Sequence, residues 1–306
     1  MNKIEKGLFL AMMFASMCAC SSDDASLQTA QVETSLVSFS FFDASMEKFD
    51  VVSRAGETRA AKTWKEYFSR LDIAIFPADG AKNDSVYRIH QLAGSDNFGS
   101  LSLRLPIGEY TMVAVASKAT SEVDIASSVL ATFPGEIPTD MAYVSQTIEV
   151  KSGATTVNSV LKRSLTKFIV SSSDSLNMDV AKADLTFTGM FSNAFNPSTG
   201  LGIKGETEKT LNKNVVFAEN DKINKKKVNI AVYAFIPEEK GTFQVGVKVY
   251  DVNDNVIRDL HFDNVVLQQN HLTTYKGPLF TSGSTFEFSF DNNDFEKSDY
   301  DTTFGD

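Results

Sequence analysis

Residues 101–116 read LSLRLPIGEYTMVAVA, and this stretch decides the fold class. In its first part Leu101, Leu103 and Leu105 alternate with polar residues, which is the period-2 pattern of a strand with one buried face. Its last part, residues 110–116, is apolar on both faces, as expected of a central strand that is covered on two sides. Because Pro and Gly between the two parts favour a tight turn, the sequence predicts a hairpin whose second strand lies deep in a β core.

The same strand patterns recur along the rest of the chain, separated by turns such as Pro77–Gly80 and Asp251–Asn255. The best helical candidate is a short turn at Trp64–Leu71, and residues 191–212 are predicted to be a Gly-, Asn- and Thr-rich connection. Short strands without long amphipathic helices are typical of β-sandwiches. Further strands are predicted at residues 37–41, 71–76, 143–150, 185–187, 228–235, 243–249, 257–262, 272–275 and 286–290, with a pair of strands within 157–170.

Length and composition limit the class of protein. The 306 residues are 42% hydrophobic and 22% charged, which excludes a collagen-like, coiled-coil or wholly disordered chain. Two domains are the better expectation at this length, and we predict them at residues 61–161 and 162–306. The 24 Phe against one Trp favour pleated, half-buried surfaces. A net charge of −10 argues against nucleic acid as the partner.

The N-terminal segment has the pattern of a secretory signal peptide at residues 1–19, with Lys3 and Lys6 before a short apolar run. That run is shorter than the roughly 20 residues that a transmembrane helix needs. Ala19 followed by Cys20 resembles a bacterial lipobox, so Cys20 is the predicted site of lipidation by an acyl chain such as palmitate. Residues 20–60 would then form a tether and a propeptide-like segment that includes the first strand.

No set of residues in the sequence is marked out for catalysis or for a metal. His90, His261 and His271 are far apart in sequence, and none belongs to a pair with metal-ligand spacing. The stretch 251–255, DVNDN, imitates the start of a calcium loop, but Val256 stands where the turn needs glycine and Phe262 where it needs glutamate. A hairpin turn is the better interpretation of that stretch. The glycines of residues 200–205 are too close together for a dinucleotide fingerprint and predict a loop.

Several segments, taken in order along the chain, resemble the fimbrillins of type V pili. They are the lipobox at Cys20, the Phe-rich strand at residues 37–41, the arginine-bearing stretch at residues 53–60, and residues 103–111 and 265–277. The resemblance implies an all-β fold of two tandem transthyretin-like Greek-key β-sandwich domains. It also implies export as a lipoprotein to the cell outer membrane and assembly into fimbriae at the cell surface.

In the stalk subunits of that family, an arginine-specific protease removes the N-terminal segment and a neighbouring subunit's strand fills the vacated groove. Carried over to this chain, Arg59 or Arg54 is the expected cleavage point. The strand with Val37, Phe39 and Phe41 is then the expected plug, because large apolar side chains gain most from burial. The expected partners are other fimbrial subunits, the outer membrane through the lipid, and host or bacterial surface receptors.

Three alternatives stay open at this stage. The polar C-terminal residues 291–300 make no obvious donor strand, which favours a fimbrial anchor or tip subunit that keeps its lipid. A surface lipoprotein that binds glycans is a second alternative, although the lone Trp64 leaves few rings for sugar stacking. A glycan-cleaving enzyme is the third, and no carboxylate pair is marked out for it. The leading prediction is a non-enzymatic structural subunit without cofactors that supports adhesion.

Overall fold

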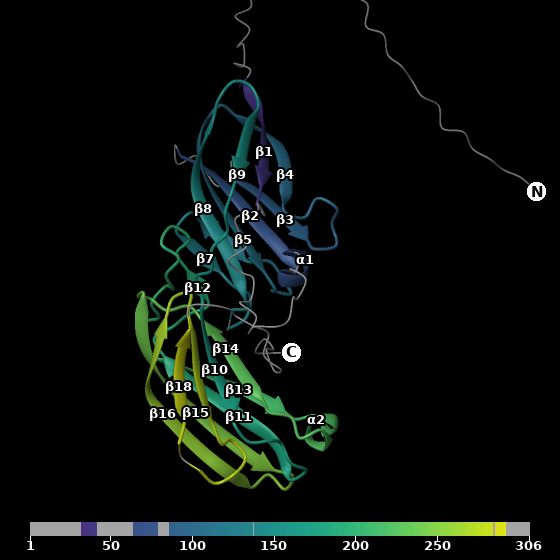
Figure 1. Ribbon diagram of the computed structural model, residues 1–306. Coiled ribbons are helices and arrows are strands. Elements are labelled where there is room, and N and C mark those ends of the chain that lie inside the picture. Colours follow the sequence, from purple (N-terminus) through teal and green to yellow (C-terminus); the bar gives the residue numbers. More distant parts are fainter. Residues whose placement is uncertain (1–31, 42–63, 79–85, 137, 284, 292–306) are drawn as a thin grey trace, which may run out of the picture. The chain divides into compact units, whose positions relative to one another are not determined.

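The computed structural model describes residues 32–41, 64–78, 86–136, 138–283 and 285–291 (Figure 1). These residues hold eighteen β-strands and two helices of only 4 and 5 residues. The predicted all-β class is therefore confirmed. All of the described strands belong to one compact unit, Glu33–Asp306.

The first half of the chain forms a β-sandwich from a three-stranded sheet with the order β4-β1-β9 and a four-stranded sheet with the order β3-β2-β5-β8. Apolar side chains of both sheets share one core, among them Phe39, Ile73 and Met112. The elements are β1 (Thr34–Ser40), α1 (Trp64–Tyr67), β2 (Arg70–Pro77), β3 (Tyr87–Leu92), β4 (Ser100–Pro106), β5 (Gly108–Ser117), β6 (Asp124–Ser127), β7 (Leu130–Thr132), β8 (Met141–Val150) and β9 (Thr155–Asn158).

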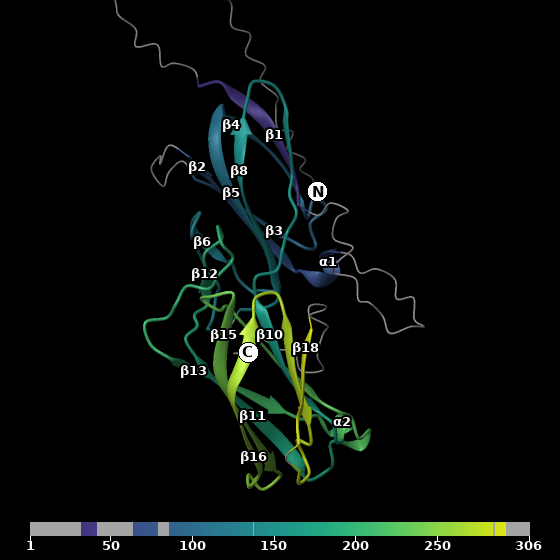
Figure 2. The same ribbon diagram turned by 60° about the vertical axis from the view of Figure 1, so that its left-hand side comes forward.

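The second half forms a sandwich from the sheets β14-β10-β17-β18 and β13-β11-β15-β16. Its core includes Phe168, Phe187 and Val247, and α2 lies at the edge of the strand layers (Figure 2). The elements are β10 (Thr166–Ser172), β11 (Val180–Gly189), β12 (Ala194–Phe195), β13 (Lys209–Val216), α2 (Glu219–Ile223), β14 (Asn229–Ala234), β15 (Lys240–Asp251), β16 (Val256–Gln268), β17 (Leu272–Gly277) and β18 (Glu287–Asp291).

The two halves repeat one strand arrangement. In the first, β1 lies between antiparallel β4 and parallel β9, and in the second, β10 lies between antiparallel β14 and parallel β17. The facing sheets β3-β2-β5-β8 and β13-β11-β15-β16 correspond strand for strand. Strand β1 is thus the counterpart of β10, and within the described residues β18 has no counterpart in the first half.

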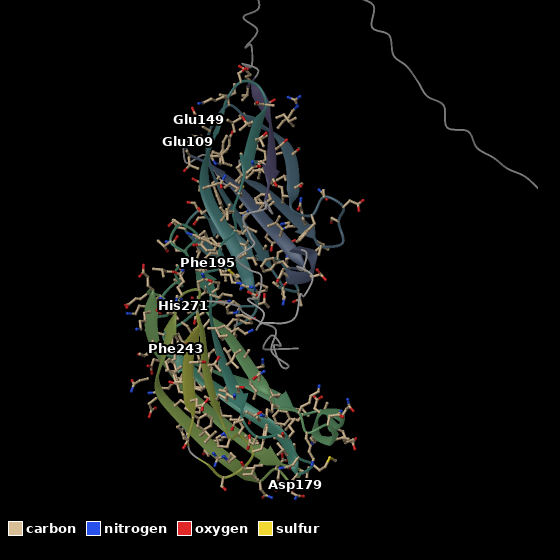
Figure 3. All side chains as sticks on the ribbon, in the orientation of Figure 1. Glu109, Glu149, Asp179, Phe195, Phe243 and His271 are labelled. Atoms are coloured by element: carbon tan, nitrogen blue, oxygen red, sulfur yellow. The ribbon has the colours of Figure 1, made fainter. Side chains whose placement is uncertain are left out.

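A third apolar cluster joins residues from both halves. Phe195 and Phe235 stack with their ring centroids 4.9 Å apart, and Tyr143 meets Phe195 edge-on at 5.3 Å. Phe195, labelled in Figure 3, belongs to β12, which pairs with β7 in the three-stranded sheet β12-β7-β6. Val113 and Val115 of β5 face this cluster, while Met112 and Ala114 face the first core. The prediction that residues 110–116 form a central strand packed on two sides is confirmed.

The predicted hairpin between residues 101–105 and 110–116 is wrong. Strand β4 pairs with β1, whereas β5 pairs with β2 and β8 in the facing sheet. Only Ile107 separates the two strands, and the shortest common hairpin loops have two residues. The chain therefore crosses from one sheet to the other at this point, and the hydroxyl of Tyr110 donates a hydrogen bond of 2.9 Å to the carbonyl of Pro106 across the corner.

Other sequence expectations were met in part. The helical turn expected at Trp64–Leu71 is α1, which ends at Tyr67. Strands β3 and β13 were not predicted, and the stretch 191–212, predicted as a connection, contains β12 and the start of β13. Residue Lys162 lies between β9 and β10 and pairs with Tyr143 through two backbone hydrogen bonds of 2.8 Å. The domain boundary near Lys162 stays a prediction.

Tyr143 gives the third cluster a measurable pH dependence. Burial raises the pKa of its phenol from 10.0 to about 12. Because the folded chain holds this proton more tightly than the unfolded chain, the resulting stabilisation is complete below about pH 10 and is lost as the pH rises toward about 12. From about pH 9 to about pH 11, the free energy of unfolding of the wild type should fall by about 1 kcal/mol more than that of Tyr143→Phe, which has no phenol to titrate. Urea unfolding at the two pH values measures this difference, and equal losses in both proteins contradict it.

Candidate functional site

Strand β1 is the part of the predicted site that the structure describes. Its seven residues all pair in antiparallel register with β4, from Thr34 opposite Pro106 to Ser40 opposite Ser100. On its other side, residues 37–40 pair in parallel with β9. Figure 1 shows β1 between these two neighbours. Within the described residues, β1 is therefore the middle strand of its sheet, and neither β4 nor β9 has another strand partner.

Backbone hydrogen bonds extend this pairing beyond both ends of β1. The amide of Ile107 donates to the carbonyl of Glu33 at 3.0 Å, and the amide of Phe41 donates to the carbonyl of Gly99 at 3.0 Å. The amide of Ser159 donates to the carbonyl of Ser40 at 2.8 Å. The main chain from Glu33 to Phe41 is thus held along its whole length.

The side chains of β1 alternate between core and solvent, as its sequence predicts. Val37 and Phe41 have no exposed surface and Phe39 is 3% exposed, whereas Leu36 is 42% exposed. The rings of Phe39 and Phe41 are stacked with their centroids 6.1 Å apart. Each of these three buried side chains contributes about 1.5–3 kcal/mol, so the strand is a large part of the first core.

The groove that holds these side chains is lined by both sheets. Leu105 of β4, Val157 of β9 and Ile75 of β2 are buried in the same cluster as Phe39. The alternation in the sequence predicted which residues of β1 are buried, but it carried no signal that joins β1 to Val157, more than a hundred residues away. Parallel pairing between distant strands depends on the tertiary fold.

The chain connectivity of β1 differs from that of every other strand of this sandwich. The chain reaches β2 only through residues 42–63, which contain Arg54 and Arg59. These two arginines and Cys20 lie outside the described residues. A single cut in residues 42–63 would leave β1 attached to the rest of the fold by noncovalent contacts alone, whereas β10 stays covalently bonded on both sides.

The other sequences singled out earlier are structural in the described part of the chain. The carboxylate of Asp251 accepts the backbone amides of Asn253 at 2.8 Å and Asn255 at 2.9 Å, and the side-chain amide of Asn255 at 3.0 Å. The side-chain bond from Asn255 is the largest cause that lowers the pKa of Asp251. The stretch 251–255 is therefore the β15–β16 hairpin turn, as predicted, and residues 200–205 form a loop.

The three histidines lie apart in the fold. His90 bonds to Asp72, His261 lies 3.0 Å from Asp259, and Nδ1 of His271 lies 2.7 Å from the carbonyl of Gln269. Among residues with described positions, no group of three or more His, Cys, Asp or Glu side chains is arranged to hold a metal ion. Nor is any described helix long and apolar enough to span a membrane.

The contribution of the buried side chains of β1 to stability can be measured by replacing one of them with alanine. Phe39→Ala should reduce the free energy of unfolding by about 3–5 kcal/mol, because it removes a buried ring and leaves a cavity. Ser38→Ala is the matched control, since Ser38 faces solvent and loses only a hydrogen bond of 3.0 Å to Ser102. The control should lose less than about 1 kcal/mol. Urea denaturation followed by circular dichroism gives both values, and a similar loss in the two variants means that β1 contributes little to the core.

Comparisons with known proteins give a family and a set of distant folds. A family model described as a family of unknown function (DUF6562) matches residues 29–304. No curated protein sequence matches the chain at a significant level.

Three solved structures illustrate the structural likeness. A candidate adhesin from Bacteroides ovatus has a TM-score of 0.49 and 11% identity, covering 81% of this chain and 88% of its own. A candidate polysaccharide-binding protein from Bacteroides thetaiotaomicron has a TM-score of 0.47 and 11% identity, with coverages of 85% and 96%. The fimbrial anchor protein Mfa2 from Porphyromonas gingivalis has a TM-score of 0.40 and 12% identity, with coverages of 79% and 90%. At these scores the likeness assigns no function to this chain.

Proposed function

The chain belongs to the family of unknown function DUF6562, and because that family prescribes no activity, we propose from the geometry of β1 that this protein is a structural subunit of cell-surface fimbriae. It assembles by exchanging β1 for a strand of a neighbouring subunit, and it supports adhesion without catalysing a reaction. The observation that carries the proposal is that a central, fully paired strand is joined to the rest of the sandwich only through residues 42–63.

The first support is that the site left empty by β1 would favour the binding of another strand. Without β1, the backbone groups of β4 and β9 that now pair with it lose their partners, and the pocket for Phe39 opens to water. Unpaired strand edges recruit other strands, and a buried apolar trough favours an incoming strand with alternating apolar side chains. A replacement must run antiparallel to β4 and parallel to β9, as β1 does.

The second support is the position of the arginines. Arg54 and Arg59 lie in a stretch of small and polar residues between β1 and α1, where the apolar strand pattern lapses. Exposed segments of this composition are preferred protease sites. In the proposed sequence of events, cleavage after either arginine frees β1, and a neighbouring strand then replaces it.

The proposal for location rests on the sequence alone. Cleavage before Cys20 leaves that residue as the single cysteine of the chain, and its acylation would hold the precursor in the outer membrane. The partners are then other fimbrial subunits. An anchor subunit would keep the lipid and β1 and would offer a different surface to the polymer.

Treatment of the purified precursor with an arginine-specific protease tests the proposal. We expect a discrete product that begins at Ala55 or Ala60 and then forms a ladder of oligomers on gels of unheated samples. The matched control is the double variant Arg54→Ala/Arg59→Ala, which should stay uncut in residues 42–63 and monomeric. Its other arginines, such as Arg70 in β2, are unchanged.

Two results decide against parts of this proposal. A precursor that resists the protease contradicts the stalk version and favours an anchor subunit that keeps β1. A cleaved product that stays an obligate monomer contradicts strand exchange, and saturable binding of that monomer to a polysaccharide favours a glycan-binding lipoprotein instead.

A further inference from the structure

The outer face of β10, in the sheet β14-β10-β17-β18, is buried although it points away from the core of the second sandwich. Side chains alternate along the strand, so Phe168 and Val170 face that core whereas Lys167 and Ile169 face outward. Lys167 nonetheless has no exposed surface, and Ile169 is only 8% exposed. A charged and an apolar side chain are therefore covered on the side of the sheet where solvent is expected.

The neighbouring strand β14 continues this buried face. Tyr233 pairs with Lys167 and Ala231 pairs with Ile169, so the four side chains share one side of the sheet. Both β14 residues are buried, and the ammonium of Lys167 lies 4.9 Å from the ring centroid of Tyr233. Tyr233 belongs to the third cluster, but Ile169 and Ala231 belong to none of the three cores that the described residues form. Something other than these cores therefore buries them.

The corresponding face of the first sandwich is open to solvent. Strand β1 is the counterpart of β10, and its outward-facing Leu36 is 42% exposed. On β4, the counterpart of β14, Ser102 and Arg104 are exposed. The strand arrangement alone thus does not bury this face, and in the second half a further segment of protein is needed to cover it.

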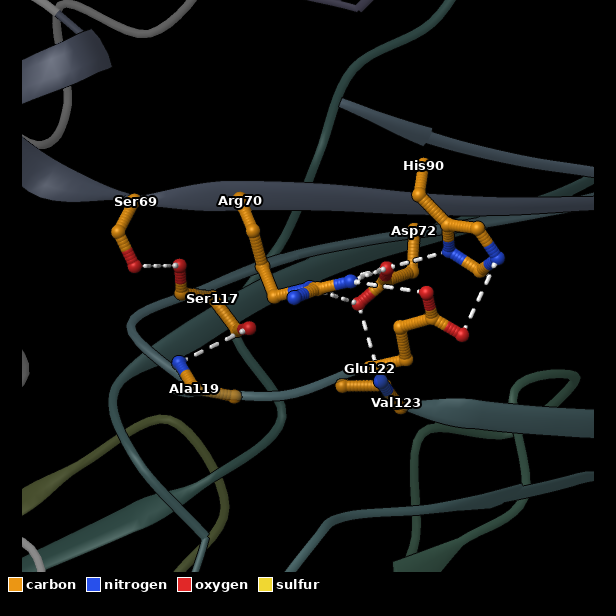
Figure 4. Close-up of polar contacts among 8 residues, drawn as sticks. All are labelled: Ser69, Arg70, Asp72, His90, Ser117, Ala119, Glu122 and Val123. Atoms are coloured by element: carbon orange, nitrogen blue, oxygen red, sulfur yellow. Dashed lines mark hydrogen bonds and ion pairs between the residues drawn. The ribbon is translucent and has the colours of Figure 1, made fainter. Parts of the chain in front are cut away.

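Another sheet of the molecule, β3-β2-β5-β8, shows how a charged side chain on an outer face becomes buried (Figure 4). Asp72 of β2 has no exposed surface, and the segment with Glu122 and Val123 crosses over it. This segment brings its own polar groups, because the backbone amide of Val123 donates to the Asp72 carboxylate at 3.0 Å. A covering segment supplies partners for the charge that it buries, and for a buried lysine such partners are carboxylates.

The described chain ends beside the buried face of β10. Asp291, the last residue of β18, pairs with Leu272 of β17, and Leu272 pairs with Lys167 of β10. These three residues lie in one row across the sheet, so Asp291 is about 10 Å from Lys167, the width of two strand spacings. Residues 292–306 follow Asp291 and, fully extended, reach about 50 Å. The chain after β18 is therefore long enough to cover the face.

The composition of residues 292–306 complements this face. They contain five acidic residues and one lysine, together with the aromatic residues Phe295, Tyr300 and Phe304. The face carries the ammonium of Lys167, and a second buried lysine, Lys213 of β13, donates to the carbonyl of Ala231 at 3.0 Å. Carboxylates offset buried positive charge, and aromatic rings cover apolar surface. Both the charge and the apolar character of this segment fit the face.

We propose that residues 292–306 dock on the outer face of β10 and β14 of the same chain. Their carboxylates compensate the ammonium groups of Lys167 and Lys213, and their aromatic rings pack on Ile169 and Ala231. All the described strands lie before residue 292, so the segment leaves the face without removing a strand from either sandwich. The proposal does not rest on strand exchange, because the face belongs to the second sandwich and β1 to the first.

Acetylation of lysines at trace levels of reagent, read by mass spectrometry, tests this docking. A chain that ends at Asp291 keeps every described strand. In it Lys167 should react about ten-fold faster than in the full chain, because a covered amine reacts only when its cover opens. Lys276, which is exposed on β17 of the same sheet, is the internal control and should react equally in both proteins. Equal protection of Lys167 in the two chains overturns the proposal.

A full-length variant tests the charges without shortening the chain. It replaces four acidic residues with amides: Asp294→Asn, Glu296→Gln, Asp299→Asn and Asp301→Asn. Lys167 should then react about five-fold faster than in the wild type, and an unchanged rate contradicts the proposed role of the carboxylates. The matched control replaces four exposed glutamates elsewhere and should keep the wild-type rate: Glu109→Gln, Glu149→Gln, Glu206→Gln and Glu208→Gln.

The dependence on protein concentration shows which chain supplies the segment. If residues 292–306 dock on their own chain, the protection of Lys167 in the full-length protein should be the same at all dilutions, since the contact is intramolecular. Protection that is lost on dilution means that the segment comes from a second copy, and it overturns docking within the chain.

Discussion

The insertion of β1 between β4 and β9 is the constraint on which the first sandwich depends. Two kinds of contact hold β1 in this position. Backbone hydrogen bonds continue past both ends of the strand, and three of its side chains, Val37, Phe39 and Phe41, are buried in the core. Neither contribution is unusual for a central strand. What sets β1 apart is that the chain continues from it through residues 42–63 before the fold resumes at α1. A single cut in residues 42–63 would therefore separate a central, fully paired strand from the rest of the chain.

The second half has the same strand arrangement, but there a single cut would not separate the central strand from the chain. Strand β10 also lies between an antiparallel and a parallel neighbour, β14 and β17, with Phe168 and Val170 in its core. It is bonded to described chain on both sides, so cutting one connection leaves it tethered. The repeat thus contains one strand that a single cut in residues 42–63 would leave held by noncovalent contacts alone, and one strand that stays tethered. The link between the halves runs through β7, β12 and the cluster around Phe195.

Sequence patterns predicted the strands better than their partners. Alternation at residues 37–41 and the double-sided apolar run at 110–116 marked β1 and β5, because side-chain periodicity follows burial directly. Strand β13 was missed because Lys213, which points inward and donates to the carbonyl of Ala231 at 3.0 Å, breaks its apolar pattern. Because only Ile107 lies between β4 and β5, their sequence resembled a hairpin, although the chain passes from one sheet to the other at this point. The buried side chains of β1 could be predicted from the sequence, whereas their neighbours in the core, Val157 among them, depend on pairing between distant strands.

The most direct test of the account locks β1 in place. Ser38 and Ser102 oppose each other on the exposed face of β1 and β4, with their Oγ atoms 3.0 Å apart, and the sequence has no cysteine after Cys20. In a chain with Cys18 and Cys20 replaced by Ser, the variant Ser38→Cys/Ser102→Cys forms a disulfide that ties the two strands. After cleavage in residues 42–63, the oxidised variant should keep β1 and stay monomeric, and reduction should release β1 and start oligomer formation. Oligomers that form equally well from the oxidised variant would show that β1 is not the strand that is exchanged.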